Sequence, residues 1–183
     1  MTSVKPVRAF VALELPVETR TRIGTLVTDL RPEIAKIRWL PAEGIHLTLR
    51  FLGETPPEIL RQLEPDLRRA AGSCPRAEAC VSGLGLFPER GGPRILWLGV
   101  ALPATVLTLQ AACEAAAIRN GFPPERRPFR PHLTLGRWRE HTPRPTLPPV
   151  DLGLATLDTL TLFQSELGPE GARYTRLATF SLG

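Results

Sequence analysis

The tetrapeptide HLTL occurs twice in this chain, at residues 46–49 and 132–135. The chain has 183 residues and only three histidines, and two of them, His46 and His132, begin these tetrapeptides. Polar and apolar residues alternate in both, which is typical of a β-strand with one face in the core. The repeat therefore predicts two similar strands, each anchored by two leucines and presenting one histidine and one threonine on the opposite face.

The segments before the two tetrapeptides follow the same order. A strand is expected at 8–15 and a helix at 18–30 before the first, and a strand at 94–101 and a helix at 104–119 before the second. Strands and helices mix without a regular βαβ order, so we expect the α+β class with antiparallel sheets. These patterns predict that residues 1–183 form a single domain of two similar lobes, related by a pseudo-twofold axis.

Other elements follow from the same reasoning. A helix is expected at 57–71, where Pro65 predicts a kink or a restart. The glycine- and proline-rich stretches GLGLFPERGG and FPPERRPFRP and residues 142–149 are expected to be connections. Further strands are expected at 37–40, 44–52, 77–82, 131–138, 157–166 and 172–181, with a turn at GPEG joining the final two.

Composition limits the class of protein. Apolar residues make up 43% of the chain, enough for a core, but no apolar run is long enough to cross a bilayer. The three cysteines, Cys74, Cys80 and Cys113, lack metal-like spacing, and their odd number argues against a disulfide framework. We therefore expect a cytoplasmic protein without a membrane partner. Nothing in the sequence requires more than a monomer.

The two strands predict a particular chemistry. If both lobes face one cleft, it receives two histidine–threonine pairs, His46 with Thr48 and His132 with Thr134. One neutral imidazole can accept a proton while a charged one donates, which suits general acid–base catalysis near neutral pH. Threonine hydroxyls can bind the oxygens of a phosphate held between them. The pattern therefore predicts attack of water on a phosphodiester.

The basic residues support a phosphate-bearing partner. Residues 119–144 contain seven arginines and two glutamates, so this stretch alone accounts for the net charge of +5. Such a patch around the second tetrapeptide suits a ligand that carries phosphate, because clustered arginines attract and bind phosphates. The alternative interpretation is a solvated arginine-rich loop.

Other sites fit the sequence less well. A single histidine on a strand is usually structural, but the repeat argues against this for the pair. Neither histidine is followed by a second ligand three or four residues later, which argues against zinc. The glycines of GLGLFPERGG precede a strand and not a helix, which argues against a dinucleotide site. We expect no metal and no cofactor.

Five blocks of sequence carry a family resemblance. In order along nearly the whole chain they are RAFVALELP, WLPAEGIHLTLRFLGE, GLGLFPERGGPRILWLGV, PFRPHLTLGR and LFQSELGPEGARYTRLATF. They resemble the RNA 2′,3′-cyclic phosphodiesterases, also called 2′-5′ RNA ligases, of the 2H phosphoesterase superfamily (the LigT type). The resemblance implies two antiparallel sheets flanking a central cleft, with helices on the outer faces. It also implies opening of a terminal 2′,3′-cyclic phosphate to a 2′-phosphate, without metal or nucleotide cofactor.

The resemblance also implies roles for the paired residues. His46 would protonate the departing O3′ and His132 would activate water, although the pseudo-twofold makes the two roles interchangeable on paper. Thr48 and Thr134 would hold phosphate oxygens. The partners would be RNA ends with a 2′,3′-cyclic phosphate, such as tRNA halves, or small cyclic nucleotides.

Three further residues are candidates for substrate binding. Arg137 matches a phosphate-side arginine of the family, and Phe51 matches an aromatic residue near the base or sugar. Strict alternation places both on the face opposite the histidines, so a bulge near Gly136 and a twist before Phe51 are required. Otherwise Phe51 is a core residue. Arg130 precedes Pro131 and His132 directly and is a further candidate for the RNA strand.

Two other functions remain open. The same residues can join RNA halves through a 2′-5′ linkage if a 5′-hydroxyl end replaces water. A binding module that holds RNA ends or nucleotides with little turnover needs only the arginines. Such a module has no need of two titrating imidazoles, which favours the hydrolase.

Overall fold

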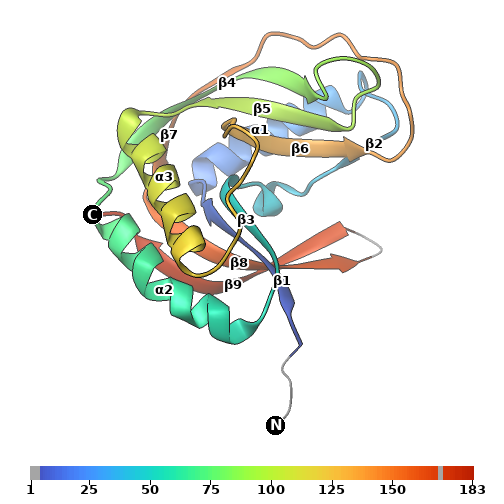
Figure 1. The fold of residues 1–183 in the computed structure, drawn as a ribbon. Helices are drawn as coiled ribbons and strands as arrows, with labels where there is room; N and C mark the ends of the chain where they lie inside the picture. The colour runs from blue at the N-terminus through green and yellow to red at the C-terminus, as the bar shows by residue number, and fades with distance from the viewer. Residues whose placement is uncertain (1–4, 169–170) are drawn as a thin grey trace.

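The structure is a computed structural model that describes residues 5–168 and 171–183. Within these ranges the chain forms an α+β fold of three helices and nine strands (Figure 1). A single 3-10 turn, η1, spans Ala42–Gly44. The helices are α1 (Val17–Leu30), α2 (Pro57–Gly72) and α3 (Ala104–Arg119). The strands are β1 (Val7–Leu13), β2 (Ile37–Trp39), β3 (Leu47–Thr55), β4 (Ala77–Phe87), β5 (Ile95–Ala101), β6 (His132–Trp138), β7 (Asp151–Leu157), β8 (Thr159–Gly168) and β9 (Gly171–Ser181).

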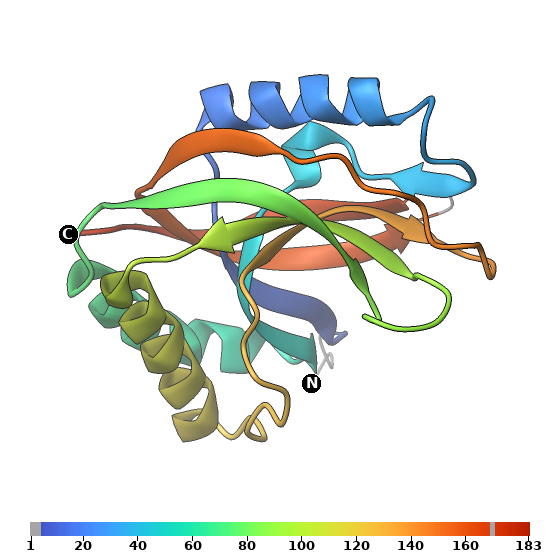
Figure 2. The ribbon, with the colours of Figure 1, turned by 90° about the horizontal axis from the view of Figure 1, so that it is seen from above.

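The strands are arranged as two matching halves. Their order is β7-β4-β5-β6-β3-β1-β8-β9, with β2 beside β6, and every pairing is antiparallel. At the centre β3 and β6 share one residue pair, Leu47 with Leu133. These are the same position in the two HLTL tetrapeptides, so an approximate twofold axis passes between them. The bilobal α+β prediction is confirmed, and the two expected sheets are joined at this pair into one curled sheet (Figure 2).

The helices cover the sheet on the side away from the cleft. α1 follows β1 in one half of the sheet, and α3 follows the equivalent strand β5 in the other half. α2 packs against α3 (Figure 1). The predicted inner faces are buried, as Ile23 and Val27 of α1 and Leu109 and Cys113 of α3 show. The helices thus shield the leucines of β3 and β6 and leave the other face of both strands to the cleft.

The helix expected at 57–71 is continuous, so the predicted restart at Pro65 does not occur. Pro65 lies on the exposed side of α2, between the buried residues Leu63 and Leu67. Water can reach the carbonyl that loses its partner there, which reduces the cost of an internal proline.

Two strands, β4 and β7, differ from the sequence-based predictions. β4 continues to Phe87 and not to residue 82, because a register shift between Val81 and Leu84 interrupts the alternation. β7 was not predicted, since the expected connection ended at residue 149 and the next strand began at 157, and Asp151 and Gly153 are poor strand formers. It pairs only with β4, at the edge of the sheet. The predicted GPEG turn includes residues 169–170, which lie outside the described residues.

Candidate active site

The two HLTL tetrapeptides meet at the middle of the sheet. Because Leu47 pairs with Leu133, the antiparallel register sets His46 across from Thr134 and His132 across from Thr48. Both leucines are fully buried, while the two histidines and two threonines are partly exposed on the opposite face. The charge of His132 acts on His46, which agrees with their placement in one space. The structure thus brings together all four residues predicted from the repeat.

The two imidazole rings are oriented by the same kind of hydrogen bond to a backbone carbonyl. Nδ1 of His46 lies 2.9 Å from the carbonyl oxygen of Gly44, and Nδ1 of His132 lies 2.7 Å from that of Arg130. A carbonyl oxygen can only accept, so Nδ1 carries a proton and donates it in both rings. Nε2 is then the atom of each ring that can take up or release a proton. Each half of the molecule therefore presents one oriented acid–base group.

Aromatic rings surround His46. The Phe10 ring stacks on the imidazole with centroids 4.6 Å apart. The Tyr174 ring is perpendicular to the imidazole, with centroids 5.0 Å apart. Burial lowers the pKa of His46 from its usual 6.5 to about 4. The hydrogen bond to Gly44 and the carboxylate of Glu14 act in the opposite direction. His46 is therefore neutral at pH 7 until an anion or a further charge changes its surroundings.

His132 has a comparable but different environment. The Phe87 ring is nearly perpendicular to the imidazole, with centroids 5.1 Å apart, and the centroid of the Trp97 ring lies at 6.5 Å. Burial lowers the pKa of His132, its hydrogen bond to Arg130 raises it, and the charge of Arg137 lowers it further. Both histidines therefore favour the neutral form in the free protein.

The two threonines are available to a substrate. Thr48 and Thr134 are partly exposed on the cleft side of β3 and β6. Within the described ranges, neither hydroxyl forms a hydrogen bond to the protein. A phosphate between the histidines can accept both of these hydrogen bonds.

Arg137 faces the histidines because of a β-bulge. Leu96 pairs with Gly136 and the next residue, Trp97, with Thr134, so Leu135 is the extra residue of β6. The bulge reverses the alternation, and the Arg137 charge acts on both histidines. A side chain at Gly136 would meet Ile37 Cδ1 at 2.6 Å, so only glycine lets β2 approach β6 here. The bulge required by the sequence analysis is present.

A second bulge turns Phe51 toward the cleft. Val11 pairs with Arg50 and Ala12 with Thr48, so Leu49 is extra in β3. The side chain of Arg50 is consequently buried on the helix side, while Phe51 is 53% exposed and its ring lies 6.1 Å from Phe10. The core interpretation of Phe51 is wrong.

Arg130 lies at the edge of the site. Its guanidinium forms an ion pair with Glu89 and lies 6.0 Å from the centre of the Phe87 ring. Its carbonyl holds Nδ1 of His132. Arg130 therefore positions His132 through its backbone, which the sequence analysis did not anticipate.

The sequence analysis also missed the aromatic lining of the site. Phe10 and Phe163 stack at 5.2 Å beneath His46, and Tyr174 completes this cluster. The available signal was position: Phe10 alternates with Ala9 and Val11, which face the main core. Pairing of β8 and β9 with β1 could not be read from the sequence, because nothing local determines which distant strands meet.

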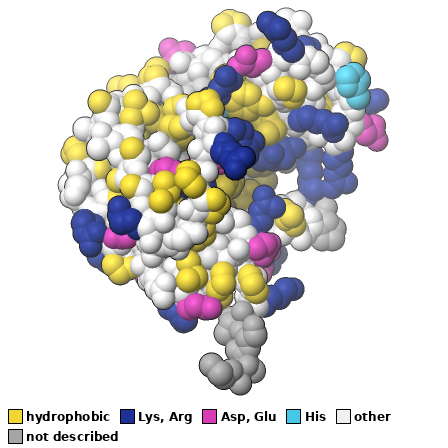
Figure 3. Space-filling model, viewed as in Figure 1, with side chains coloured by type: hydrophobic (Ala, Val, Ile, Leu, Met, Phe, Trp, Pro, Cys, Tyr) yellow, Lys and Arg dark blue, Asp and Glu magenta, His cyan; other side chains and the backbone are white. Residues whose placement is uncertain are grey.

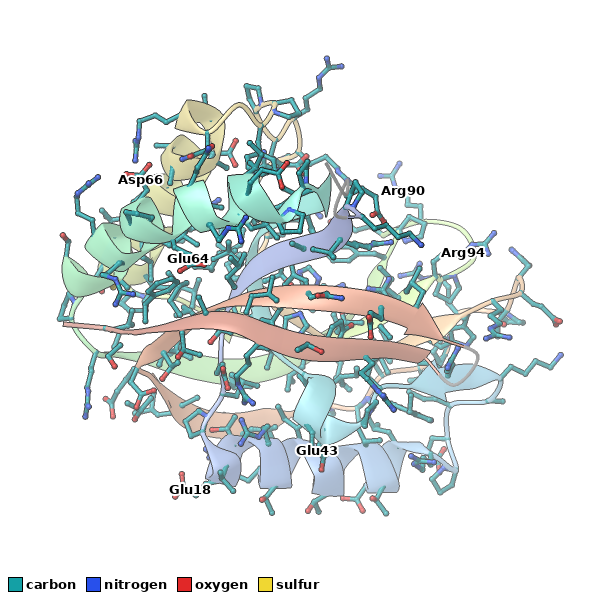
Figure 4. All side chains as sticks on the ribbon, turned by 90° about the horizontal axis from the view of Figure 1, so that it is seen from below. Glu18, Glu43, Glu64, Asp66, Arg90 and Arg94 are labelled. Carbon is teal, nitrogen blue, oxygen red and sulfur yellow. The ribbon has the colours of Figure 1, made fainter. Side chains whose placement is uncertain are left out.

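Charge is unevenly distributed around the molecule. Figure 3 shows a hollow between the two halves of the sheet, with Lys and Arg side chains gathered along its edge. In Figure 4, Arg90 and Arg94 project from the connection between β4 and β5, while Glu18, Glu64 and Asp66 lie on the helices. The basic side of the molecule thus borders the hollow, which favours an anionic ligand.

Residues 5–168 and 171–183 contain neither a cluster of metal-ligating side chains nor a helix suited to a membrane. No group of three or more histidine, cysteine, aspartate or glutamate side chains is placed to hold a metal ion. No helix in these ranges has both the length and the apolar character needed to cross a membrane.

The curled sheet and its paired HLTL strands define a 2H phosphoesterase. The protein-family model described as LigT like Phosphoesterase matches residues 13–97 and 100–174 of the sequence. The chain belongs to this family. The two matched stretches correspond to the two halves of the chain, each with one tetrapeptide.

Named relatives cover nearly the whole chain. A protein of Thermus thermophilus named RNA 2′,3′-cyclic phosphodiesterase is 36% identical over 96% of this chain and 90% of its own length. Its namesake in Methanothermobacter thermautotrophicus is 32% identical over 96% of this chain and 99% of its own. The crystal structure of Escherichia coli LigT complexed with 3′-AMP has a TM-score of 0.84 and 30% identity, covering 97% of this chain and 99% of that one.

Proposed function

We propose that this protein hydrolyses RNA 2′,3′-cyclic phosphate ends to 2′-phosphomonoesters, with His46 and His132 as the acid–base pair. The observation that carries the proposal is the shared orientation of the two rings, each with Nδ1 bound to a carbonyl and Nε2 free to exchange a proton. The names of the relatives support the substrate, and the 3′-AMP complex of E. coli LigT supports a site for a ribose phosphate.

The reaction needs two proton transfers on opposite sides of the phosphorus. Nε2 of neutral His132 takes a proton from water, and the water oxygen forms a bond to phosphorus. The bond from phosphorus to O3′ breaks, and Nε2 of protonated His46 delivers its proton to O3′. The product is a 2′-phosphate beside a free 3′-hydroxyl, and each transfer contributes about 10²–10⁴-fold.

In the free protein burial keeps His46, the assigned acid, neutral at pH 7, so groups that raise its pKa are needed for this role. The Glu14 carboxylate raises the pKa of His46, which helps this ring to hold the proton that the acid must donate. A bound phosphodiester anion acts in the same direction. Arg137 lowers the pKa of both histidines, so in the free protein it favours the neutral form that His132 needs as the base and opposes the charged form that His46 needs as the acid.

Substrate contacts follow from the same face. Thr48 and Thr134 donate to the non-bridging oxygens, and Arg137 neutralises their charge. Phe51, exposed beside Phe10, offers a surface on which a base can stack. Arg130 is placed to meet the RNA strand next to the terminal nucleotide.

Product identity tests the proposal. A short RNA ending in a 2′,3′-cyclic phosphate is incubated with the protein in EDTA, and phosphorus NMR identifies the monoester that forms. We expect a 2′-phosphate. A 3′-phosphate would mean that O2′ leaves, which contradicts the proposed geometry, and binding without turnover would favour a binding module. Addition of an RNA with a 5′-hydroxyl end shows whether a 2′-5′ linkage forms as well.

A further inference from the structure

Within the described part of the chain, Arg50 is the one charged residue that is buried, with 7% of its surface exposed. The bulge in β3 turns it away from the cleft and toward α3. There its Nε lies 2.5 Å from Oε2 of Glu114, and its Nη1 lies 4.0 Å from Oε2 of Glu125. A buried cation of this kind is costly unless its charge and its donors are all satisfied.

Nη1 and Nη2 of Arg50 each donate to a backbone carbonyl, one within β3 and one in a distant segment. Nη1 donates to the carbonyl of Phe51 at 2.8 Å, inside the bulged part of β3. Nη2 donates to the carbonyl of Pro123, in the segment that leads into β6. One planar guanidinium therefore joins the strand that carries Thr48 to the approach of the strand that carries His132.

The segment 121–131 needs such an anchor. Its sequence, GFPPERRPFRP, contains four prolines, which have no N–H to donate to a strand partner. From Pro123 onward within this segment, the described residues form two backbone hydrogen bonds to side chains of earlier elements. The Pro123 carbonyl accepts from Arg50, and the Glu125 N–H donates to Glu114 at 2.8 Å. The segment then reaches Arg130, whose carbonyl orients His132.

We infer that Arg50, paired with Glu114, is a positioning residue for the proposed reaction. It acts on both sides of the cleft through backbone carbonyls: it fixes the bulge that turns Phe51 inward and the segment that sets the acceptor for Nδ1 of His132. The inference rests on the proposed hydrolysis, and it assigns to Arg50 no contact with the substrate.

Kinetics of charge-matched variants test this role. Arg50→Met removes the charge and all donors, whereas Arg50→Lys keeps the charge but cannot reach both carbonyls at once. With the same cyclic-phosphate RNA, we expect kcat to fall by roughly 10²-fold in the methionine variant and less in the lysine variant. Arg69→Met removes the exposed Arg69–Asp66 pair on α2 and is the matched control, with kcat unchanged.

A double variant separates positioning from stability. Arg50→Met leaves the partly buried Glu114 without its ion-pair partner and lowers the midpoint of thermal unfolding. Arg50→Met with Glu114→Gln removes both charges, so we expect the midpoint to recover while kcat stays low. Recovery of kcat together with the midpoint would show that Arg50 serves stability alone and would overturn the inference.

Limited proteolysis gives a readout that does not depend on activity. Trypsin cuts poorly before proline, so within 121–131 the bond after Arg126 is its one good site. We expect Arg50→Met to accelerate cleavage there by about tenfold, through local opening of the segment, with other sites unaffected. An unchanged rate would overturn the inference. If the wild-type protein proves inactive while this rate rises, the anchor stands as a structural feature and the proposed function fails.

Discussion

The hydrogen bonds of the two imidazoles decide what each ring can do. A carbonyl two residues earlier in the chain fixes Nδ1 in both cases, at Gly44 for His46 and at Arg130 for His132. The rings differ in their neighbours, since only His46 stacks on an aromatic ring, that of Phe10, and is influenced by Glu14. Similar orientation with different surroundings allows one ring to act as acid and the other as base.

The first prediction concerns the histidines themselves. His46→Ala and His132→Ala should each lower kcat/KM for a cyclic-phosphate RNA by about 10²–10⁴-fold, because each removes one proton transfer. His141→Ala is the control, since this third histidine lies outside both tetrapeptides and is exposed. Initial rates under subsaturating substrate measure the effect. Full activity in either of the first two variants would remove that histidine from the mechanism.

Single residues were the most predictable level of the site. The repeated alternation placed His46, Thr48, His132 and Thr134 on one face, and the structure has them there. The rings packed against His46 were missed because they come from β1, β8 and β9, and periodicity carries no information about which strands pair.

At the scale of single strands, two bulges control the site. Each lies just after an HLTL threonine and shifts the face of the residues that follow. Strict alternation would bury Arg137 and Phe51 and expose Arg50, which is the reverse of the structure. A bulge near Gly136 and a twist before Phe51 were required from the sequence, but register shifts depend on partner strands, so the bulge in β3 was not predicted.

The second prediction tests the bulge in β6. Gly136→Ala should lower the free energy of unfolding by about 1–3 kcal/mol, because its methyl group overlaps Ile37. The shift of β2 should also weaken RNA binding through Arg137. Gly72→Ala is the matched control: nothing lies within 4 Å of the added methyl, and it lies in helix α2, so we expect a change of less than about 1 kcal/mol. Urea unfolding measures both variants, and equal stabilities would contradict the packing argument.

At the scale of the whole molecule, the twofold arrangement creates the site. The strand order reads the same way outward from the Leu47–Leu133 pair, and the cleft lies where the halves meet. The fold class and the two-lobe organisation were predictable because the chain repeats strand, helix and HLTL strand. The joining of the halves into one sheet was not, because it depends on a single pair.

The third prediction links the site to the stability of the free protein. His46 has its pKa lowered from 6.5 to about 4, so the unfolded chain binds this proton at a higher pH than the folded protein does. The titration of His46 therefore does not change the free energy of unfolding above pH 6.5. Between pH 6.5 and pH 4 it lowers this free energy by up to about 3 kcal/mol. His46→Asn cannot titrate and should lack this part of the loss. Urea unfolding of both proteins at pH 7 and pH 4.5 gives the difference, and parallel losses would show that His46 is not buried as described.

The measurement that tests the central claim most directly is the pH dependence of kcat and kcat/KM in EDTA. The account requires one charged and one neutral imidazole, so both profiles should be bell-shaped, with apparent pKa values that belong to the pair. Burial lowers the pKa of both histidines in the free protein, so kcat/KM should be greatest below pH 6.5. Bound phosphate favours the charged ring, so the optimum of kcat should lie at higher pH. A rate that does not vary between pH 4 and pH 8, or one that appears only when a metal ion is added, would contradict the two-histidine account.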